Sequence, residues 1–155
     1  MLGFIKITIF KYSDFEERIM ALDGIVLVPA VVMGIIIGLV EVFFVHADEA
    51  GMGWFMHAMH ALPFTMLFVF VSMNISFVFS LLNVSITENL WVDLGVRVLN
   101  GLIAMFKIAG AAAIVGRVGE KWYHTFIIGV IIILAPYAWD LAGPSITPML
   151  PSWAQ

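Results

Sequence analysis

The sequence predicts an all-α integral membrane protein, with four transmembrane helices in an up-and-down bundle that follows a short interfacial N-terminal segment. Three observations support this prediction. First, 63% of the 155 residues are hydrophobic and only 12% are charged, about half the charged fraction of a soluble domain. Second, apolar segments at 25–46, 54–82, 92–116 and 122–142 each exceed the roughly 20 residues needed to cross a bilayer. Third, short links join these segments, as expected for antiparallel neighbours.

Composition also excludes several classes of function. The chain has no cysteine, so disulfides, thiolate nucleophiles and iron–sulfur clusters are excluded, and any bound metal must use His, Asp, Glu or Met. The net charge is -4 and the basic residues are scattered along the sequence. No cluster of Lys and Arg indicates binding to nucleic acid. Nucleophile-elbow, HExxH and phosphate-loop motifs are absent from the sequence. The lipid bilayer is the expected partner, and an enzyme is not the favoured interpretation.

The segment 1–24 precedes the first span and is predicted to lie in the membrane interface. Its apolar residues are interrupted by Lys6 and Lys11, whose ammonium groups can reach the headgroups while their stems stay in lipid. Ser13 stands three residues before Glu16, which is the spacing of a capping box and predicts a helix start.

Tryptophans mark the ends of the predicted spans. Trp54, Trp91, Trp122 and Trp139 lie near these ends, where indole rings prefer the headgroup level. The tail 143–155 contains three prolines and is predicted to leave the helix and run along the membrane surface. An even number of spans puts both termini on one side, and the positive-inside count favours the cytoplasmic side by about one charge.

All four histidines fall on one predicted membrane face, opposite the N-terminus. Imidazole with a methionine thioether suits copper, and imidazole with carboxylate suits zinc, iron or manganese. A haem needs two imidazoles on facing helices, and His57 with His124 is the best-placed pair. The alternative is that these histidines simply lie among the lipid headgroups. The candidate metal ligands are His46, His57, His60, His124, Met56, Asp48 and Glu49.

A cation pathway is a second interpretation of the same face. Glu41 lies about one turn and Lys107 about two turns inside their helix ends, so the two charges can pair within the bundle. Hydroxyl groups seven, four and four residues apart are predicted to share one face of the second span. They can line a path or only seal helix contacts. The pathway candidates are Glu41, His57, His60 and Lys107, with the hydroxyl stripe Thr65, Ser72, Ser76 and Ser80.

Two further patterns predict structural contacts. Near the opposite membrane face, Asp93 lies four residues before Arg97, and Asp140 lies at a similar depth; these three charges predict structural ion pairs. Gly34 and Gly38 form a GxxxG pair, which predicts close approach of the first span to a neighbouring helix.

The favoured hypothesis is a small oligomeric membrane protein that provides or gates a pathway for a proton, a metal ion or an alkali ion. Four packed helices leave little lumen, so a pore is expected at an interface between copies. The first alternative is a subunit of a membrane redox or enzyme complex that binds haem or copper through the histidines. The second is a purely structural membrane subunit.

Overall fold

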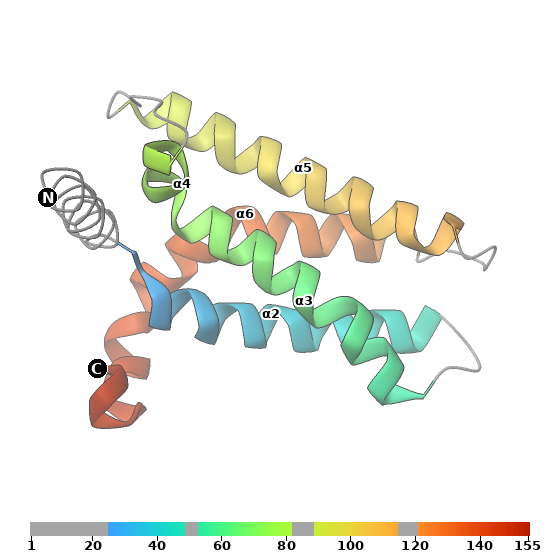
Figure 1. Cartoon of the computed structure of the whole chain (residues 1–155), viewed down its shortest axis with the longest axis horizontal. Helices are drawn as coiled ribbons and strands as arrows, with labels where there is room; N and C mark the ends of the chain where they lie inside the picture. The colour runs from blue at the N-terminus through green and yellow to red at the C-terminus, as the bar shows by residue number, and fades with distance from the viewer. Residues whose placement is uncertain (1–24, 49–52, 82–88, 115–120) are drawn as a thin grey trace, which may run out of the picture.

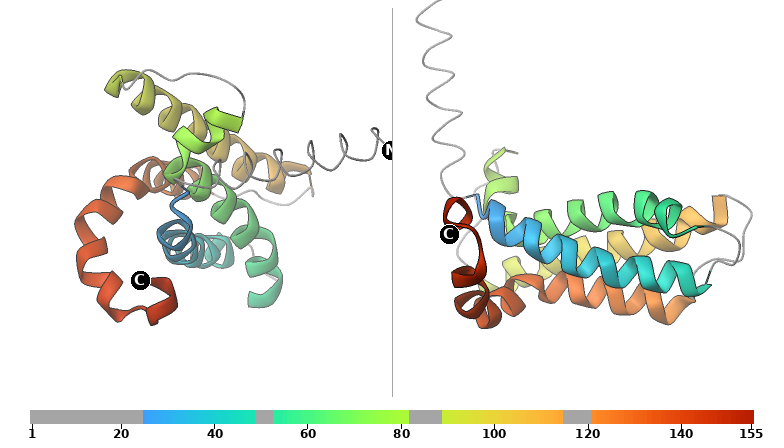
Figure 2. Two further views of the ribbon diagram at one scale, coloured as in Figure 1. Left: turned by 60° about the vertical axis from the view of Figure 1, so that its left-hand side comes forward. Right: turned by 90° about the horizontal axis from the view of Figure 1, so that it is seen from below.

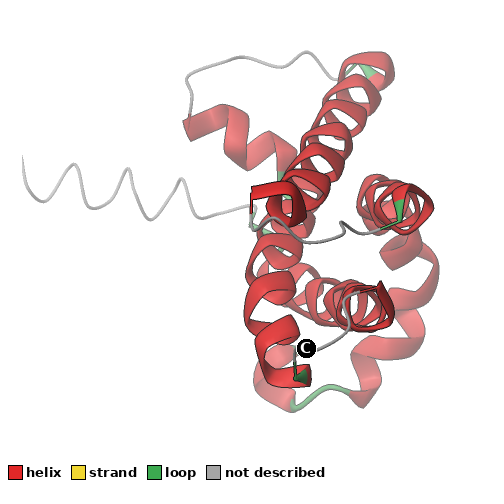
Figure 3. Cartoon of the chain, turned by 90° about the vertical axis from the view of Figure 1, so that its right-hand side faces the viewer, coloured by secondary structure: helices red, strands yellow, loops and turns green. Residues whose placement is uncertain are grey.

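The computed structural model describes residues 25–48, 53–81, 89–114 and 121–155. All regular elements in these ranges are helices, and no strand occurs in them (Figure 3). The elements are α2 (Leu27–Asp48), α3 (Trp54–Met73), α4 (Ile75–Leu81), α5 (Leu90–Ile114), α6 (Trp122–Ile146), η1 (Thr147–Met149) and η2 (Ser152–Ala154). The predicted interfacial segment 1–24 and Glu49 lie outside the described residues, so the expectations for them stay predictions.

Three helical stretches are long and apolar enough to cross a membrane: Leu27–Asp48, Trp54–Met73 and Trp122–Met149. Their outer surfaces are apolar, with exposed fractions of 61% for Phe43 and 73% for Phe55. Large apolar side chains on the outside of a helical protein suit lipid rather than water. The structure therefore confirms the predicted all-helical class and gives three helices that are long and apolar enough to span a membrane.

The charges of α5 distinguish it from the other long helices. Its 25 residues give enough length for a bilayer, but Asp93, Arg97 and Lys107 interrupt its apolar sequence. A charged side chain in hydrocarbon is costly unless it is paired or reaches water. The fourth span expected at 92–116 therefore stays a prediction.

The four long helices lie side by side with alternating directions (Figure 1). α3 and α6 lie in the middle, and α2 and α5 each pack against both of them. The end of α2, the start of α3, the end of α5 and the start of α6 consequently meet at one end, at the right in Figure 1. We call this the histidine end, after His46, His57, His60 and His124. The opposite end, where α4 lies, is called the arginine end, after Arg97.

An apolar core separates the two ends. Four of its larger side chains, from α2, α3 and α6, are at most 2% exposed, and we call these four the apolar layer: Ile37, Val69, Ile128 and Ile132. Ala104 and Ile108 bring α5 into the same cluster. A fully buried side chain of this size contributes roughly 1.5 to 3 kcal/mol when it is transferred out of water. In a membrane the helices pack from lipid and not from water, so this transfer does not drive their association. Dispersion contacts and shape therefore hold this layer together.

Small residues set the closest helix approaches. A Cβ atom added to Gly38 would lie 2.6 Å from Leu62 Cδ2, and one on Gly34 would lie 3.4 Å from the Met66 backbone. The GxxxG pair thus allows α2 to approach α3, as predicted. A second close approach, between α5 and α6, was not predicted. A Cβ on Gly101 of α5 would lie 3.0 Å from the carbonyl oxygen of Gly129 in α6.

The helix expected over 54–82 is interrupted at Asn74. Its backbone, with φ -122° and ψ 38°, leaves the helical region, so α3 ends at Met73 and α4 begins at Ile75. The Asn74 amide donates to the Phe70 carbonyl oxygen (3.0 Å), and its Oδ1 accepts the Val26 backbone N–H (2.7 Å). An asparagine side chain that bonds nearby backbone competes with helix continuation. The prediction of one uninterrupted helix is therefore wrong at this residue.

The C-terminal helix also differs from the expectation. α6 includes Pro136 and Pro144 and continues to Ile146, four residues into the predicted tail 143–155. Figure 2 shows this part of the chain curving around, with the C-terminus near the start of α2. A proline removes one backbone donor and bends a helix without always ending it. Beyond Ile146 the tail forms the two short 3-10 turns η1 and η2.

Candidate functional site

The buried carboxylate and imidazole of the histidine end lie on facing surfaces of α2 and α3. Glu41 is 2% exposed and His57 is 0% exposed. The two helices are antiparallel, and Gly38 lies against Leu62, so Glu41, one turn further along α2, lies level with the first two turns of α3. The fold thus brings a titratable carboxylate to the level of a titratable imidazole inside apolar packing.

His57 is linked to the end of the helix assembly through His46. The two Nδ1 atoms are 3.1 Å apart, so one ring donates its proton and the other accepts it. His46 is half-buried and stacks on Trp54, with ring centroids 3.7 Å apart. This stack holds His46 at the outer end of α2. The hydrogen bond therefore joins a fully buried imidazole to one near the surface.

A second histidine contact fastens α2 to α6. Asp48 Oδ2 accepts a bond from His124 Nδ1 (2.6 Å) and from the Lys121 backbone N–H (2.9 Å). His124 also stacks on Phe44, with ring centroids 4.2 Å apart. A carboxylate at a helix N-terminus satisfies free N–H groups and opposes the helix dipole. Asp48 thus caps α6 from the end of α2.

Lys121 completes this cap from the solvent side. Its Nζ lies 3.2 Å from Asp48 Oδ1. Hydrogen bonding to the Asp48 carboxylate raises the pKa of Lys121 above its usual 10.5, with a smaller effect of Tyr123. The Lys121 side chain is exposed, so this ion pair adds little to stability.

His60 does not join His57, although the spacing suggested that they project together. His57 faces the interior, whereas His60 is exposed and its Nδ1 lies 2.7 Å from the Met56 carbonyl oxygen. Met56 is exposed on the same outer surface. Within the described ranges, no group of three or more His, Asp or Glu side chains could hold a metal ion. The copper, zinc, iron and haem hypotheses stay predictions.

The hydroxyl stripe is divided by the helix break. Thr65 and Ser72 are buried on α3, and the Thr65 hydroxyl donates to the Ala61 carbonyl oxygen (3.0 Å). Ser76 and Ser80 are exposed on α4, beyond Asn74. Apolar Val69, 0% exposed, lies between Thr65 and Ser72. A continuous hydroxyl route along one helix is therefore not present, because the chain turns at Asn74 and the apolar layer interrupts the buried part.

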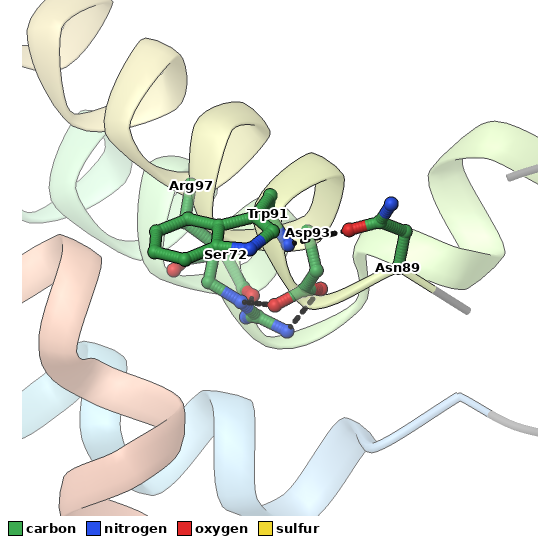
Figure 4. Close-up of polar contacts among 5 residues, drawn as sticks. All are labelled: Ser72, Asn89, Trp91, Asp93 and Arg97. Atoms are coloured by element: carbon green, nitrogen blue, oxygen red, sulfur yellow. Dashed lines mark hydrogen bonds and ion pairs between the residues drawn. The ribbon is translucent and has the colours of Figure 1, made fainter. Parts of the chain in front are cut away.

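The arginine end uses its charges to bind backbone. Arg97 forms a two-pronged ion pair with Asp93, through Nε (2.7 Å) and Nη2 (2.8 Å), and Nη1 donates to the Ser72 carbonyl oxygen (Figure 4). The guanidinium also lies 5.7 Å from the Tyr137 ring centroid. The Asp93–Arg97 pair has the predicted partners. Asp140 is exposed, and no ion pair joins it to Arg97 in the described structure.

Two asparagines at this end were missed as contact residues. Asn74 links the start of α2 to α3 through Val26. Asn100, 7% exposed, donates from Nδ2 to the Phe68 carbonyl oxygen across to α3 (2.9 Å). The available signal was an amide within an otherwise apolar segment, since such a group needs a hydrogen-bond partner in lipid.

Lys107 and Glu41 lie in different surroundings. Glu41 is buried, whereas Lys107 is exposed on α5 with its Nζ 4.4 Å from the Phe64 ring centroid. The depth match that suggested an internal pair took no account of which way each helix face points. Lys107 is therefore not an internal counter-charge in this fold.

The histidine end can accept and release protons. Its buried carboxylate and linked imidazoles all change charge by gaining or losing one proton. No family model, curated protein or solved structure matches the chain. The chemistry of the site is therefore argued from its own geometry.

Proposed function

We propose that the protein provides a cation pathway across the membrane and that the cation is the proton. The observation that carries this proposal is the burial of Glu41 and His57 on facing helices, with His57 hydrogen-bonded to His46. Ionisable groups within membrane helices are costly, and where they occur they commonly form proton relays. The same cost would select against these groups in a purely structural subunit.

The proposed entry runs inward from the histidine end. A proton taken up by His46 near the surface passes to His57 through the bond between their Nδ1 atoms, which are 3.1 Å apart. The imidazole can then release a proton from its other ring nitrogen. Glu41, at the level of the first turns of α3, is the proposed acceptor. Movement of the proton changes the charge of each group in turn without moving a hydrated ion.

The proposed gate is the apolar layer of Ile37, Val69, Ile128 and Ile132. These side chains are 0 to 2% exposed, and a proton needs hydrogen-bond partners or water to move through such a layer. Thr65 lies on the histidine side of Val69 along α3. Proton transfer beyond Thr65 therefore requires displacement of the apolar layer, or a route along an interface between copies. We propose a homo-oligomer for this reason.

The proposed topology has four spans, with α5 as the fourth. Mutual neutralisation of Asp93 and Arg97 lowers the cost of placing the start of α5 in the membrane. The N- and C-termini then share one side, which we propose is cytoplasmic. The histidine end would face the opposite compartment.

Proton flux in liposomes tests this function. Purified protein is reconstituted with a pH-sensitive dye inside, and a potassium diffusion potential drives proton entry. Wild type should acidify the lumen faster than protein-free liposomes. Glu41→Gln and His57→Asn should each slow flux about tenfold or more, since general acid and base groups contribute at least that much to proton transfer.

His60→Asn is the matched control, because this exposed histidine lies on the same helix and bonds only the Met56 carbonyl among the described contacts. It should leave flux unchanged. Wild-type flux equal to that of empty liposomes would overturn the proposal. Full flux in both Glu41→Gln and His57→Asn, with intact helical content, would overturn the site assignment.

A further inference from the structure

The ammonium of an exposed lysine on α5 lies level with the middle of α3, which is a candidate transmembrane helix. Lys107 of α5 is exposed, and its Nζ lies 4.4 Å from the ring centroid of Phe64 in α3. Phe64 is ten residues after Trp54 and nine before Met73, the two ends of α3. At 1.5 Å per residue, the ammonium is about 15 Å from either end of α3. If α3 crosses the bilayer, this charge lies near the centre of the hydrocarbon.

The direction of the side chain prevents the usual escape to the headgroups. Side chains lean towards the N-terminus of their own helix, and for α5 that direction leads away from the nearer histidine end. The contact with Phe64 fits this inward direction. A lysine near a helix end normally extends its ammonium to the interface. Lys107 instead extends it towards the membrane centre.

The surroundings of Lys107 are apolar and exposed. Ile103 and Phe106 of α5 are 50% and 78% exposed, and Phe64 itself is 41% exposed. No carboxylate of the described residues forms an ion pair with Lys107. The aromatic face offers partial compensation, but a charge against lipid tails remains costly. This face therefore requires a cover that carries negative charge.

Among the described residues, no carboxylate of a second copy would lie free at the right depth. Asp48 and Asp93 are engaged in ion pairs near the ends of their helices, and Glu41 is buried. The exposed Asp140 is 18 residues after Trp122, or about 27 Å from the histidine end. In a parallel copy, Asp140 therefore differs from Lys107 by about 12 Å in depth across the membrane. In a copy inserted in the opposite orientation, the difference in depth is similar.

We propose that the face formed by Phe64, Ile103, Phe106 and Lys107 binds a transmembrane helix of another protein that carries an Asp or Glu near its centre. The apolar side chains supply packing, and Lys107 pairs with the central carboxylate. In lipid, water cannot solvate the two charges when they are separated. The ion pair therefore strengthens binding of the partner helix and fixes its depth relative to α5. This inference rests on α3 crossing the membrane and not on proton transport.

Synthetic helices test the proposal directly. Because the chain has no cysteine, a single Gln155→Cys substitution allows donor labelling of the chain at this exposed residue. Acceptor-labelled Leu/Ala helices of about 20 residues carry one central Glu, or one central Gln as the matched control. Energy transfer in phosphatidylcholine liposomes then gives the affinity of each helix.

The Glu helix should bind about tenfold more tightly than the Gln helix, which corresponds to roughly 1.4 kcal/mol. Lys107→Met should remove this preference and Lys107→Arg should retain it. Lys121→Gln, which removes a charge outside the proposed face, should have no effect. Helical content and unfolding midpoint confirm that each variant is folded.

Equal binding of the Glu and Gln helices to the wild type would overturn the proposal, and this comparison involves no variant of the protein. Preference that survives Lys107→Met would also overturn it. A third arm mixes donor- and acceptor-labelled copies of the chain. Self-association that Lys107→Met abolishes, without any preference for the Glu helix, would show that the face is covered by a second copy instead.

Discussion

Apart from the Asp93–Arg97 ion pair, polar side chains at the arginine end bind backbone, whereas most of those at the histidine end bind one another. Arg97, Asn74 and Asn100 each donate to a carbonyl oxygen near the end of α3. His46 contacts His57, and His124 contacts Asp48. The first set joins the last turns of α3 to α5 and to the start of α2, close to the helix break at Asn74. The second set consists of groups that gain or lose charge.

This difference indicates different roles for the two ends. A backbone carbonyl cannot titrate, so a side chain bonded to it keeps its partner at every pH and serves to hold helices in place. Two titratable side chains share a proton whose position can change. We therefore expect the arginine end to govern stability and the histidine end to govern transport. The following predictions test that separation, from the largest expected effect on stability to the smallest.

Arg97→Met should lower the free energy of unfolding by about 3 kcal/mol, because Asp93 loses its counter-charge and the Ser72 carbonyl loses its donor. Unfolding in detergent, followed by tryptophan fluorescence, measures this loss. Proton flux per folded molecule should stay within twofold of wild type, about 0.4 kcal/mol in barrier height. The double variant Arg97→Met/Asp93→Leu should recover at least part of the stability. An unchanged unfolding midpoint in the single variant would contradict the structural role of this pair.

Asn74→Ala should lower the free energy of unfolding by about 2 kcal/mol, since it leaves the Val26 N–H without the Asn74 acceptor and removes the side-chain bond to the Phe70 carbonyl oxygen, which keeps only the backbone N–H of residue 74. Hydrogen exchange at Val26 should become faster. Asn89→Ala is the matched control, because Asn89 is exposed and its side chain accepts only the Trp91 N–H in the described contacts. Its loss should cost about 1 kcal/mol, as for an ordinary helix cap. A larger effect at Asn89 than at Asn74 would reverse the proposed order.

Glu41→Gln should change the free energy of unfolding by less than about 1 kcal/mol, because the amide keeps the shape and removes a charge that is costly in lipid. Its proton flux should nevertheless fall. Measuring both properties on one preparation separates this variant from Arg97→Met. Parallel losses of stability and flux in both variants would remove the distinction between the two ends.

Stability at high pH should depend weakly on Lys121. Its pKa is raised in the folded state by Asp48, so its contribution is complete below 10.5 and is lost as the pH rises through the higher folded pKa. The unfolding midpoint of the wild type should therefore decrease by a small amount as the pH is raised beyond 10.5. Lys121→Gln should show a smaller fall. Identical pH profiles for the two proteins would show that the exposed ion pair contributes nothing.

Local sequence patterns predicted the helices better than their contacts. Asp93 and Arg97 are four residues apart on one helix, so spacing alone indicated their pair. His57 and His60 are three residues apart, yet they point to different surroundings. The i, i+3 rule gives neighbouring positions on a helix surface, but it does not say where the boundary between the packed and exposed faces falls. That boundary depends on where α2 and α6 lie around α3.

The sequence by itself determined the all-helical class with segments apolar enough to cross a membrane, the approximate ends of the long helices and the close approach at Gly34 and Gly38. These features follow from composition, segment length and residue size, which are local properties. Tertiary structure decided that His57 contacts His46, that Asp48 caps α6 and that Lys107 lies exposed beside Phe64. Each of these outcomes depends on the rotation of one helix against another. That rotation is set by packing summed over all the helices, so no single segment contains it.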